Sequence, residues 1–320
     1  MKAVINTQYG APSVLTIKDI EKPSIKGNEI LVKIMATAVN TGDCRIRRAD
    51  PFAVRFFFGL TKPKINILGG VFSGEIEAIG PDVKLFNKGD KVFGSTDMRF
   101  GAYAEYKSFP ETATLALIPE SLSYTEAAVI PFGGATALHF LKKAAIKPGE
   151  KVLIVGASGA VGTAAVQIAK SFGAIVTGVN STVNIDLVKS LGADVVIDYT
   201  KEDFTQNGEL YDVIFDTVNT IDIQRSLRSL NRNGKMILSA AGLKETLLGL
   251  WISMTSSKKI ITGVTQQSAA DMAFLKGLAE TGKMKPVIDR TYKLSEMTAA
   301  HSYVETGRKK GNVAIDMSLN

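Results

Sequence analysis

The central part of the chain alternates short apolar runs with helical patterns. Residues 151–155 (KVLIV) form a continuous apolar run, which is typical of a fully buried parallel strand, and the run ends at Gly156. From Val161 the apolar positions recur with helical spacing until Gly173. Further short apolar runs follow at 174–179, 194–198, 211–216, 235–240 and 258–264. Strands alternating with helices at this interval predict β-α-β units and a mostly parallel sheet with right-handed crossovers.

Residues 1–118 show a different pattern, because their strand-like segments are separated by glycine and proline turns without intervening helices. This pattern predicts a compact β-rich domain. The expected strands lie at 14–17, 30–39, 74–79, 91–94 and 103–109.

The last part of the chain predicts a return to this first domain. A helical stretch over 125–145 leads into the apolar run at 151–155, and residues 265–320 then carry two helical and two strand-like segments. Since this tail is too small to stand alone, we expect it to pack against residues 1–118. The domain with the predicted parallel sheet, 119–264, is then inserted in a split partner domain, with a cleft between them for a substrate.

Three glycines at three-residue spacing, Gly156, Gly159 and Gly162, separate the first predicted strand from the first predicted helix. Glycines let a ligand approach the backbone, and the N-terminus of a helix attracts anions. The motif therefore predicts a site for a dinucleotide pyrophosphate over Gly156–Val161, including Ser158 and Ala160. The alternative is a tight strand-to-helix turn that needs small residues only for packing.

Ligands bind parallel sheets at the carboxyl ends of the strands. We therefore expect one crevice to be lined by the segments that end the predicted strands: Val155–Gly156, Gly178–Ser181, Asp198–Tyr199, Asp216–Val218 and Ser239–Gly242.

The end of the second strand of this domain bears on the choice of cofactor. No acidic residue stands there before Asp186, whereas Ser181, Thr182 and Asn184 offer hydroxyl and amide groups. A carboxylate there would bond the ribose hydroxyls of NAD, and it would repel a 2′-phosphate. The sequence therefore favours NADPH over NADH, although Val183 brings no basic charge. The alternative is that these polar residues are ordinary helix caps.

Composition limits the classes of function. The chain has 320 residues, is 45% hydrophobic, carries a net charge of +7, and contains one cysteine, Cys44. A single cysteine excludes an internal disulfide and suits a reducing, cytoplasmic compartment. The sequence shows no signal-peptide pattern and no apolar run long enough for a membrane span. Its 38 basic residues are dispersed, so nucleic-acid binding is not expected.

The order and spacing of several motifs make the chain resemble the zinc-independent quinone oxidoreductase group (zeta-crystallin-like) of the medium-chain dehydrogenase/reductase superfamily. The resemblance covers essentially the whole chain. Its landmarks are N-T-G-D (Asn40–Asp43), F-S-G-E-I-E-A-I-G (Phe72–Gly80), K-G-D-K-V-F-G (Lys88–Gly94), G-A-Y-A-E-Y (Gly101–Tyr106), G-A-T-A (Gly134–Ala137), A-S-G-A-V-G (Ala157–Gly162), S-L-G-A-D-V-V-I-D-Y (Ser190–Tyr199) and G-N-V-A-I (Gly311–Ile315).

The resemblance implies an α/β fold class: a Rossmann dinucleotide-binding domain with a doubly wound parallel sheet, inserted in a split β-rich GroES-like catalytic domain. It also implies that no metal is bound, because Asn40 and Gly69–Val71 stand where zinc-dependent relatives place ligands. Cys44, His139 and His301 do not suggest a metal site either. We expect His139 on an apolar helix and His301 on a surface-like one.

The resemblance also assigns roles to particular residues. Asn40 would lie beside the nicotinamide and the substrate, and Thr136 would contact the nicotinamide end. Arg45 stands where some relatives have a candidate proton-donating tyrosine, and it could stabilise an enolate. The remaining implied cofactor contacts are Gly156, Ser158, Gly159, Ala160 and Val161 on the pyrophosphate, Ser181 and Tyr199 on the 2′-phosphate, Val218 in the crevice, Ser239, Ala240, Ala241 and Gly242 on the carboxamide, and Asn312 at the phosphate end.

Hydride transfer to a conjugated carbonyl needs no metal, because the negative charge delocalises onto an oxygen that hydrogen bonds can stabilise. The favoured function is therefore an NADPH-dependent reductase of quinones or α,β-unsaturated carbonyls. The alternatives are an enoyl reductase acting on an acyl thioester, and a non-catalytic NADPH-binding protein with an RNA or protein partner. Residues 52–60 (FAVRFFFGL) are either an apolar wall over the substrate or part of the core. The resemblance further implies a homodimer formed through residues 258–264.

Overall fold

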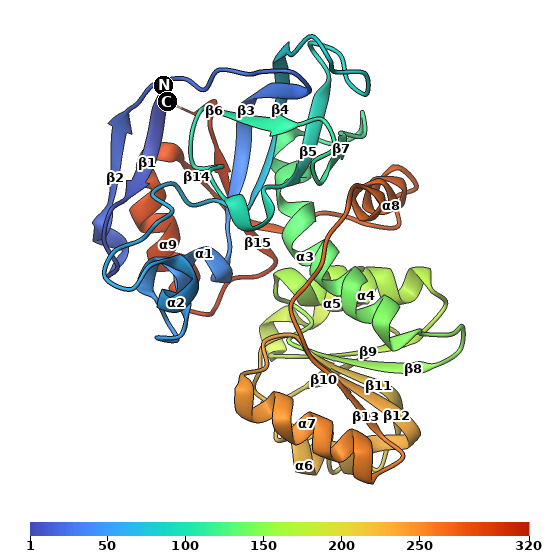
Figure 1. Ribbon diagram of the computed structural model, residues 1–320. Coiled ribbons are helices and arrows are strands. Elements are labelled where there is room, and N and C mark those ends of the chain that lie inside the picture. Colours follow the sequence, from blue (N-terminus) through green and yellow to red (C-terminus); the bar gives the residue numbers. More distant parts are fainter. Residues whose placement is uncertain (320) are drawn as a thin grey trace. The chain divides into compact units, whose positions relative to one another are not determined.

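The computed structural model describes residues 1–319 as two compact units (Figure 1). Within the described residues, unit 1 comprises 1–132, 267–280 and 286–319, and unit 2 comprises 133–266 and 281–285. The long helix α3 (Tyr124–Ala144) contains the point where the chain passes from the first unit to the second. The boundary at 118 proposed from the sequence lies before this helix begins.

A six-stranded, entirely parallel sheet forms the centre of unit 2. Its order is β10-β9-β8-β11-β12-β13, so the chain runs outward from β8 in one direction and then returns to the other side. The strands are β8 (Lys151–Val155), β9 (Ile175–Asn180), β10 (Val195–Asp198), β11 (Tyr211–Asp216), β12 (Leu230–Leu238) and β13 (Lys259–Ile261). All six strands were predicted, and this order places the topological switch point between β8 and β11.

Helices cover both faces of this sheet. Figure 1 shows α4 (Ala160–Ser171) and α5 (Ile185–Ser190) on one face, and α6 (Ile223–Ser226) and α7 (Leu243–Thr255) on the other. Short 3-10 turns stand at Thr182–Asn184 and Leu227–Ser229. The strands read as unbroken apolar runs because both faces are covered. Helix α7 was not predicted.

Unit 1 is built on a mostly antiparallel seven-stranded sheet. Its order is β14-β15-β3-β4-β5-β7, and β6 pairs with β3 beside this path. The strands are β14 (Ile288–Lys293), β15 (Asn312–Asp316), β3 (Glu29–Val39), β4 (Val71–Ile79), β5 (Lys91–Ser95), β6 (Tyr106–Pro110) and β7 (Leu115–Leu117). A separate hairpin joins β1 (Lys2–Asn6) to β2 (Leu15–Asp19).

The end of the chain completes the sheet of unit 1. Strand β15 pairs in antiparallel fashion with β3 and in parallel fashion with β14. The predicted fold class, a β-rich partner domain split by an inserted dinucleotide domain, is therefore confirmed. The helices of this unit are α1 (Thr41–Arg48), α2 (Val54–Phe58), α8 (Ala269–Glu280) and α9 (Met297–Glu305), with 3-10 turns at Pro12–Val14, Asp97–Arg99 and Leu294–Glu296.

Helix α1 and helix α2 were not predicted, since both are short and α1 is largely polar.

Among residues 1–319, no helix is long and apolar enough to cross a membrane.

Candidate active site

The turn after β8 contains two glycines at which any side chain would collide with neighbouring atoms. Gly156 has a φ of 75°, and a Cβ there would lie 2.6 Å from Val218 Cγ1. A Cβ on Gly162 would lie 2.1 Å from the carbonyl oxygen of Gly156. Only glycine at these two positions lets α4 begin directly against the end of β8.

Gly159 differs from these two glycines. It precedes α4 as the N-cap residue, and the nearest atom to a Cβ there would be the Gly156 carbonyl oxygen, at 3.5 Å. The protein itself therefore has room for a side chain at this position. A ligand that approaches the backbone would fill that room, and the first-turn N–H groups of Ala160, Val161 and Gly162 lack intrahelical acceptors. These residues fit the pyrophosphate of a dinucleotide.

Polar side chains from the ends of β8 and β9 meet beside this turn. The amide nitrogen Nδ2 of Asn184 lies 3.1 Å from Ser158 Oγ and 3.4 Å from Ser181 Oγ, and it donates to both. Because the two serine oxygens accept these hydrogen bonds, their own hydroxyl hydrogens are available to an acceptor such as a phosphate oxygen.

At the end of β10, the buried carboxylate of Asp198 accepts three hydrogen bonds. Its donors are the Thr182 hydroxyl, the Thr200 hydroxyl at 2.7 Å and the Thr200 amide at 3.0 Å. The hydrogen bonds from Thr182 and Thr200 lower the pKa of Asp198. Lys201 Nζ lies 3.8 Å from the same carboxylate, and the neighbouring Tyr199 is exposed.

The carboxylate of Asp216 fixes the loop that follows β11. It is buried and accepts backbone N–H groups from four successive residues, including Val218 at 2.9 Å and Asn219 at 2.8 Å. At the end of β12, the Ser239 hydroxyl donates to the carbonyl of Asp216 at 3.0 Å. The predicted residues Ser239–Gly242 thereby follow directly on the strand next to β11.

Thr136 reaches the same region from α3. A Cβ on Gly133 would lie 2.2 Å from the carbonyl oxygen of Ala160, so α3 crosses closely over the start of α4. Thr136 follows Gly133 by three residues and therefore lies on the same side of that helix. In unit 2, the predicted cofactor residues follow the carboxyl ends of the parallel strands, and Thr136 lies on the helix that passes close to the start of α4.

In unit 1, Asn40 is held at the start of α1. Its backbone N–H donates to Asp43 Oδ2 at 3.0 Å, and Gly69 N–H donates to Asp43 Oδ1 at 3.2 Å. Burial raises the pKa of Asp43 to about 6, against the lowering effect of these two hydrogen bonds. The sequence analysis gave Asp43 no role, although an acidic residue three positions after an N-cap is a recognised capping signal.

A second asparagine lies next to Asn40. Val313 of β15 pairs with Val39 of β3 in antiparallel register, so Asn312 and Asn40 are the following pair. Both are at most 5% exposed. Asn312 Nδ2 donates to the Val287 carbonyl at 3.1 Å.

Each of these asparagines keeps one buried atom without a hydrogen bond: Nδ2 of Asn40, a donor, and Oδ1 of Asn312, an acceptor. Leaving buried polar atoms unpaired costs free energy, so this donor and acceptor are suited to a polar ligand. Their pairing depends on strand register, and no local sequence signal could have revealed it.

Other predicted residues of unit 1 lie differently. Arg45 is exposed on α1. Phe52, Phe56 and Phe57 are also exposed, so the core alternative for residues 52–60 is wrong for these three, although Phe58 is buried. Lys309, which the sequence analysis did not single out, donates to the Gly311 carbonyl at 2.6 Å, and burial lowers its pKa to about 8.

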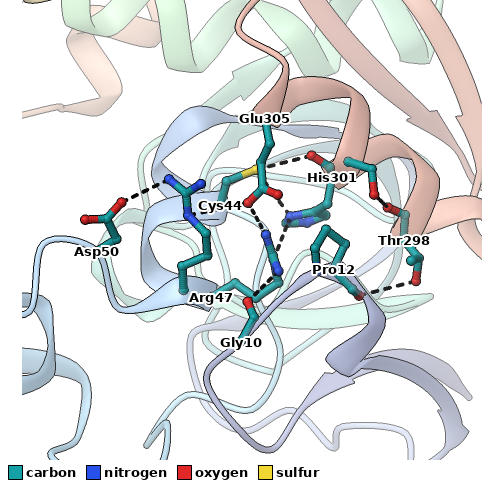
Figure 2. Close-up of polar contacts among 10 residues, drawn as sticks. Gly10, Pro12, Cys44, Arg47, Asp50, Thr298, His301 and Glu305 are labelled. Atoms are coloured by element: carbon teal, nitrogen blue, oxygen red, sulfur yellow. Dashed lines mark hydrogen bonds and ion pairs between the residues drawn. The ribbon is translucent and has the colours of Figure 1, made fainter.

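The helix that follows Asn40 is anchored by a buried guanidinium, that of Arg47 (Figure 2). Its Nη1 donates to the Gly10 carbonyl at 2.6 Å, and its Nη2 pairs with the carboxylate of Glu305. Its Nε lies 3.4 Å from Nδ1 of His301. One side chain of α1 therefore ties this helix to α9 and to the loop after β1.

Cys44 and His301 extend the same cluster (Figure 2). The sulfur of Cys44 lies 3.3 Å from His301 Nδ1. Since Arg47 Nε is always a donor, Nδ1 accepts and the neutral ring carries its hydrogen on Nε2. Burial lowers the pKa of His301 to about 3 and raises the pKa of Cys44 to about 12, so both groups are neutral.

The expectation that His301 lies on a surface-like helix is therefore wrong. It is fully buried, and its ring contacts Tyr103 edge-on at a centroid distance of 5.7 Å. Its burial depends on partners from α1 and from the loop before β6, which the local pattern of α9 cannot show. Among residues 1–319, no three His, Cys, Asp or Glu side chains lie together as a metal site would need.

A β-rich unit combined with an all-parallel sheet and a glycine turn defines a class: two-domain dehydrogenases and reductases that use a nicotinamide dinucleotide. Comparisons with known proteins place the chain within that class. Residues 26–120 match the family model described as alcohol dehydrogenase GroES-like domain, and residues 191–315 match the one described as zinc-binding dehydrogenase.

Among curated relatives, a 2-methylene-furan-3-one reductase of Solanum lycopersicum is 33% identical, over 98% of this chain and 79% of its own length. A chloroplastic NADPH-dependent alkenal/one oxidoreductase of Arabidopsis thaliana is 30% identical over the same shares. The solved structure of a quinone oxidoreductase from Coxiella burnetii is 31% identical, covers 99% of both chains and superposes with a TM-score of 0.88.

The chain therefore belongs to the quinone oxidoreductase family of the medium-chain dehydrogenase/reductase superfamily, and it is an oxidoreductase.

The anchoring role of Arg47 predicts a large loss of stability in Arg47→Met. The substitution leaves the Glu305 carboxylate without its buried partner, and we expect the free energy of unfolding to fall by about 3 kcal/mol. Arg225→Met is the matched control, because Arg225 is 52% exposed, pairs with the exposed Asp203 and does not contact Glu305, so its loss should cost less than about 1 kcal/mol. Urea unfolding of both variants measures the difference, and equal losses would contradict the assignment.

Burial of His301 predicts that acid destabilises the protein. Its pKa is lowered to about 3, so between pH 6.5 and about 3 the unfolded state binds the proton and the folded state does not. Stability from this residue is therefore lost as pH falls through that window. The pKa of Asp43 is raised from 3.8 to about 6, so between these two pH values the folded state binds the proton and the unfolded state does not. Stability from Asp43 is therefore gained, not lost, as pH falls through that window.

The variant His301→Gln isolates the histidine, because glutamine can still accept from Arg47 without titrating. We expect the difference in unfolding free energy between wild type and His301→Gln to be constant above pH 7 and to shrink steadily on acidification. Stability curves that stay parallel down to pH 4 would show that His301 does not titrate in this way.

Proposed function

We propose that the protein reduces quinones or α,β-unsaturated carbonyl compounds with NADPH and without a metal ion. The observation that carries this proposal is the pair of amide atoms on Asn40 and Asn312 that lack hydrogen bonds. Unit 2 of the protein adds a glycine turn that is suited to a dinucleotide. The relatives named as an alkenal/one oxidoreductase and a quinone oxidoreductase support the substrate class.

The residues of unit 2 have the task of binding and orienting the cofactor. We propose that the turn Gly156–Val161 holds the pyrophosphate, with the first-turn N–H groups of Ala160 and Val161 as donors. The N–H groups of Gly156, Ala157 and Gly159 already donate to backbone carbonyls. We also propose that Thr136 and Ser239–Gly242 serve the nicotinamide end. When bound, the reduced nicotinamide supplies a hydride to an electrophilic carbon of the substrate. Val218, fixed through Asp216, borders the same end of the sheet.

The residues of unit 1 have the task of stabilising charge on the substrate oxygen. Asn40 Nδ2 is a buried donor, and it can donate a hydrogen bond to a carbonyl oxygen that gains negative charge. Arg45 stays protonated and can stabilise an enolate or quinol oxygen, but it is a poor proton donor. Water therefore supplies the proton. The ammonium of Lys309 suits a phosphate of the cofactor. The unpaired Oδ1 of Asn312 is an acceptor, so it suits a hydrogen-bond donor of the cofactor rather than a phosphate oxygen.

We argue the proposed preference for NADPH over NADH from the polar side chains near the end of β9. Ser158 and Ser181 accept hydrogen bonds from Asn184, which leaves their hydroxyl hydrogens available to a 2′-phosphate, and Tyr199 is exposed nearby. Val183 adds no charge, so we propose that NADH is also used, with lower affinity. The carboxylate of Asp198 is occupied by threonine hydroxyls, which limits its repulsion of a phosphate.

We further propose a homodimer in the cytoplasm. The compartment is inferred from the single cysteine, Cys44, which suits a reducing environment.

The test is the oxidation of NADPH and NADH, followed by absorbance, with a naphthoquinone, an alkyl enone, a 2-alkenal and crotonyl coenzyme A, each with and without chelator. We expect chelator-resistant turnover of a quinone or enone, with NADPH preferred. Turnover of the thioester alone would instead identify an enoyl reductase. Tight NADPH binding without any turnover would support the non-catalytic alternative.

Asn40→Ala tests the proposed hydrogen-bond donor. We expect kcat/KM for the best acceptor to fall roughly a hundredfold, because one donor to a developing oxyanion is lost. Asn87→Ala, which removes an exposed asparagine of the same unit, is the matched control and should leave kcat/KM unchanged. Equal activity of the two variants would remove Asn40 from the mechanism.

A further inference from the structure

Helix α2 of unit 1 and the turns beside it expose four large apolar side chains within nine residues. They are Phe52 (66% exposed), Phe56 (67%), Phe57 (77%) and Leu60 (59%), and we call them the α2 face. The rings of Phe52 and Phe56 contact each other edge-on, with 6.0 Å between their centroids. Since one aromatic side chain offers about 150–250 Å², the α2 face presents roughly 500 Å² of apolar surface. An exposed apolar patch of this size marks an interaction site.

We propose that the α2 face inserts into the surface of an anionic lipid membrane, so that the enzyme binds membranes peripherally. The proposal concerns one segment of unit 1, and it does not depend on the substrate or the cofactor of the enzyme.

The backbone that carries the α2 face is held in place by specific contacts. Gly59 ends α2 with a φ of 119°, and a Cβ there would lie 2.1 Å from the carbonyl oxygen of Lys62. The Lys64 N–H closes this turn by donating to the Phe58 carbonyl at 2.7 Å. The Tyr9 hydroxyl donates to the Gly59 carbonyl, also at 2.7 Å. Because the turn is already fixed, little of its backbone has to be ordered when the face binds.

Two other side chains of α2 hold the segment to the rest of unit 1. Phe58 is buried, and its ring lies 5.9 Å from the ring of Phe100. The guanidinium of Arg55 lies over the ring of Tyr9, at 4.7 Å from its centroid. The contact with Phe100 also brings the turn that contains Met98, which is 62% exposed, near α2. The exposed phenylalanines therefore project from an anchored base, and Met98 adds apolar surface beside them.

The charges around the α2 face favour anionic lipid as its partner. Residues 45–64 contain six basic residues and one acidic residue, Asp50. Lys62 and Lys64 are exposed in the turn that follows α2, and Arg99 is exposed next to Met98. Anionic headgroups attract such cations, while apolar side chains between the cations enter the boundary of the acyl chains.

The same charges speak against two other occupants. A quinone or an enone carries no negative charge that exposed lysines would complement, so a wall over the substrate does not explain them. A second copy of the same face would bring like charges together, which opposes association.

The test is co-sedimentation of the full chain with vesicles of phosphatidylcholine alone and with vesicles that also contain phosphatidylserine. We expect the protein to bind the anionic vesicles at least about tenfold more tightly than the neutral ones. Raising the salt concentration should weaken this binding, because salt screens the attraction between the lysines and the headgroups.

The apolar part of the proposal is tested by Phe56→Ser/Phe57→Ser, which should weaken binding to anionic vesicles at least about tenfold. Leu60→Ser and Leu85→Ser form a matched pair. Both replace an exposed leucine of unit 1, at 59% and 63% exposure, but Leu85 lies between β4 and β5, outside the α2 face. We expect Leu60→Ser to weaken binding and Leu85→Ser to leave it unchanged.

The charged part is tested by Lys62→Glu, which should weaken binding to anionic vesicles but not to neutral ones. Lys18→Glu makes the same change of charge at an exposed position of β2, and it should have a much smaller effect. Circular dichroism checks that all variants are folded.

Three outcomes would overturn the proposal. The first is a wild-type protein that binds neither kind of vesicle, with a raised KM for a water-soluble quinone in Phe56→Ser/Phe57→Ser, which would assign the face to the substrate. The second is vesicle binding that Leu60→Ser and Leu85→Ser weaken equally. The third is a wild-type oligomer that does not bind vesicles and that Phe56→Ser/Phe57→Ser dissociates, which would assign the face to a second copy.

Discussion

The close contact between α4 and the turn after β8 is the constraint on which unit 2 depends. A Cβ on Gly162 would lie 2.1 Å from the Gly156 carbonyl oxygen, so the helix can begin there only without a side chain. Because it begins there, its unpaired N–H groups point toward the carboxyl edge of the sheet. The ends of β9 and β11 flank that edge and place Ser181 and Val218 beside it. Packing and ligand binding thus rest on the same glycine-limited contact.

In unit 1, buried polar groups fix the helix that carries the candidate site. Arg47 fixes α1 through contacts to Gly10, His301 and Glu305, and the start of that helix fixes Asn40. Breaking a buried ion pair costs far more free energy than breaking an exposed one, so these contacts strongly favour this position of α1. The unsatisfied amide atoms of Asn40 and Asn312 are then held ready for a ligand.

Much of this architecture could be predicted because buried parallel strands read as continuous apolar runs, as at 151–155 and 211–216. The glycine motif could also be predicted, because the spacing of its glycines reflects a close backbone contact. Helix α7 could not be predicted, because its apolar residues lie on its exposed face as well as its buried one. The burial of His301 and the Asn40–Asn312 pair depend on tertiary pairing between distant segments, which no local pattern records.

The central claim is that the turn after β8 binds a dinucleotide, and calorimetry of NADPH binding to wild type and Gly159→Ala tests it most directly. The protein has room for the added methyl group, so thermal unfolding should be nearly unchanged. The account predicts that NADPH binds at least about tenfold more weakly to Gly159→Ala, because the methyl group blocks the approach of the pyrophosphate. Equal dissociation constants for the two proteins would contradict it.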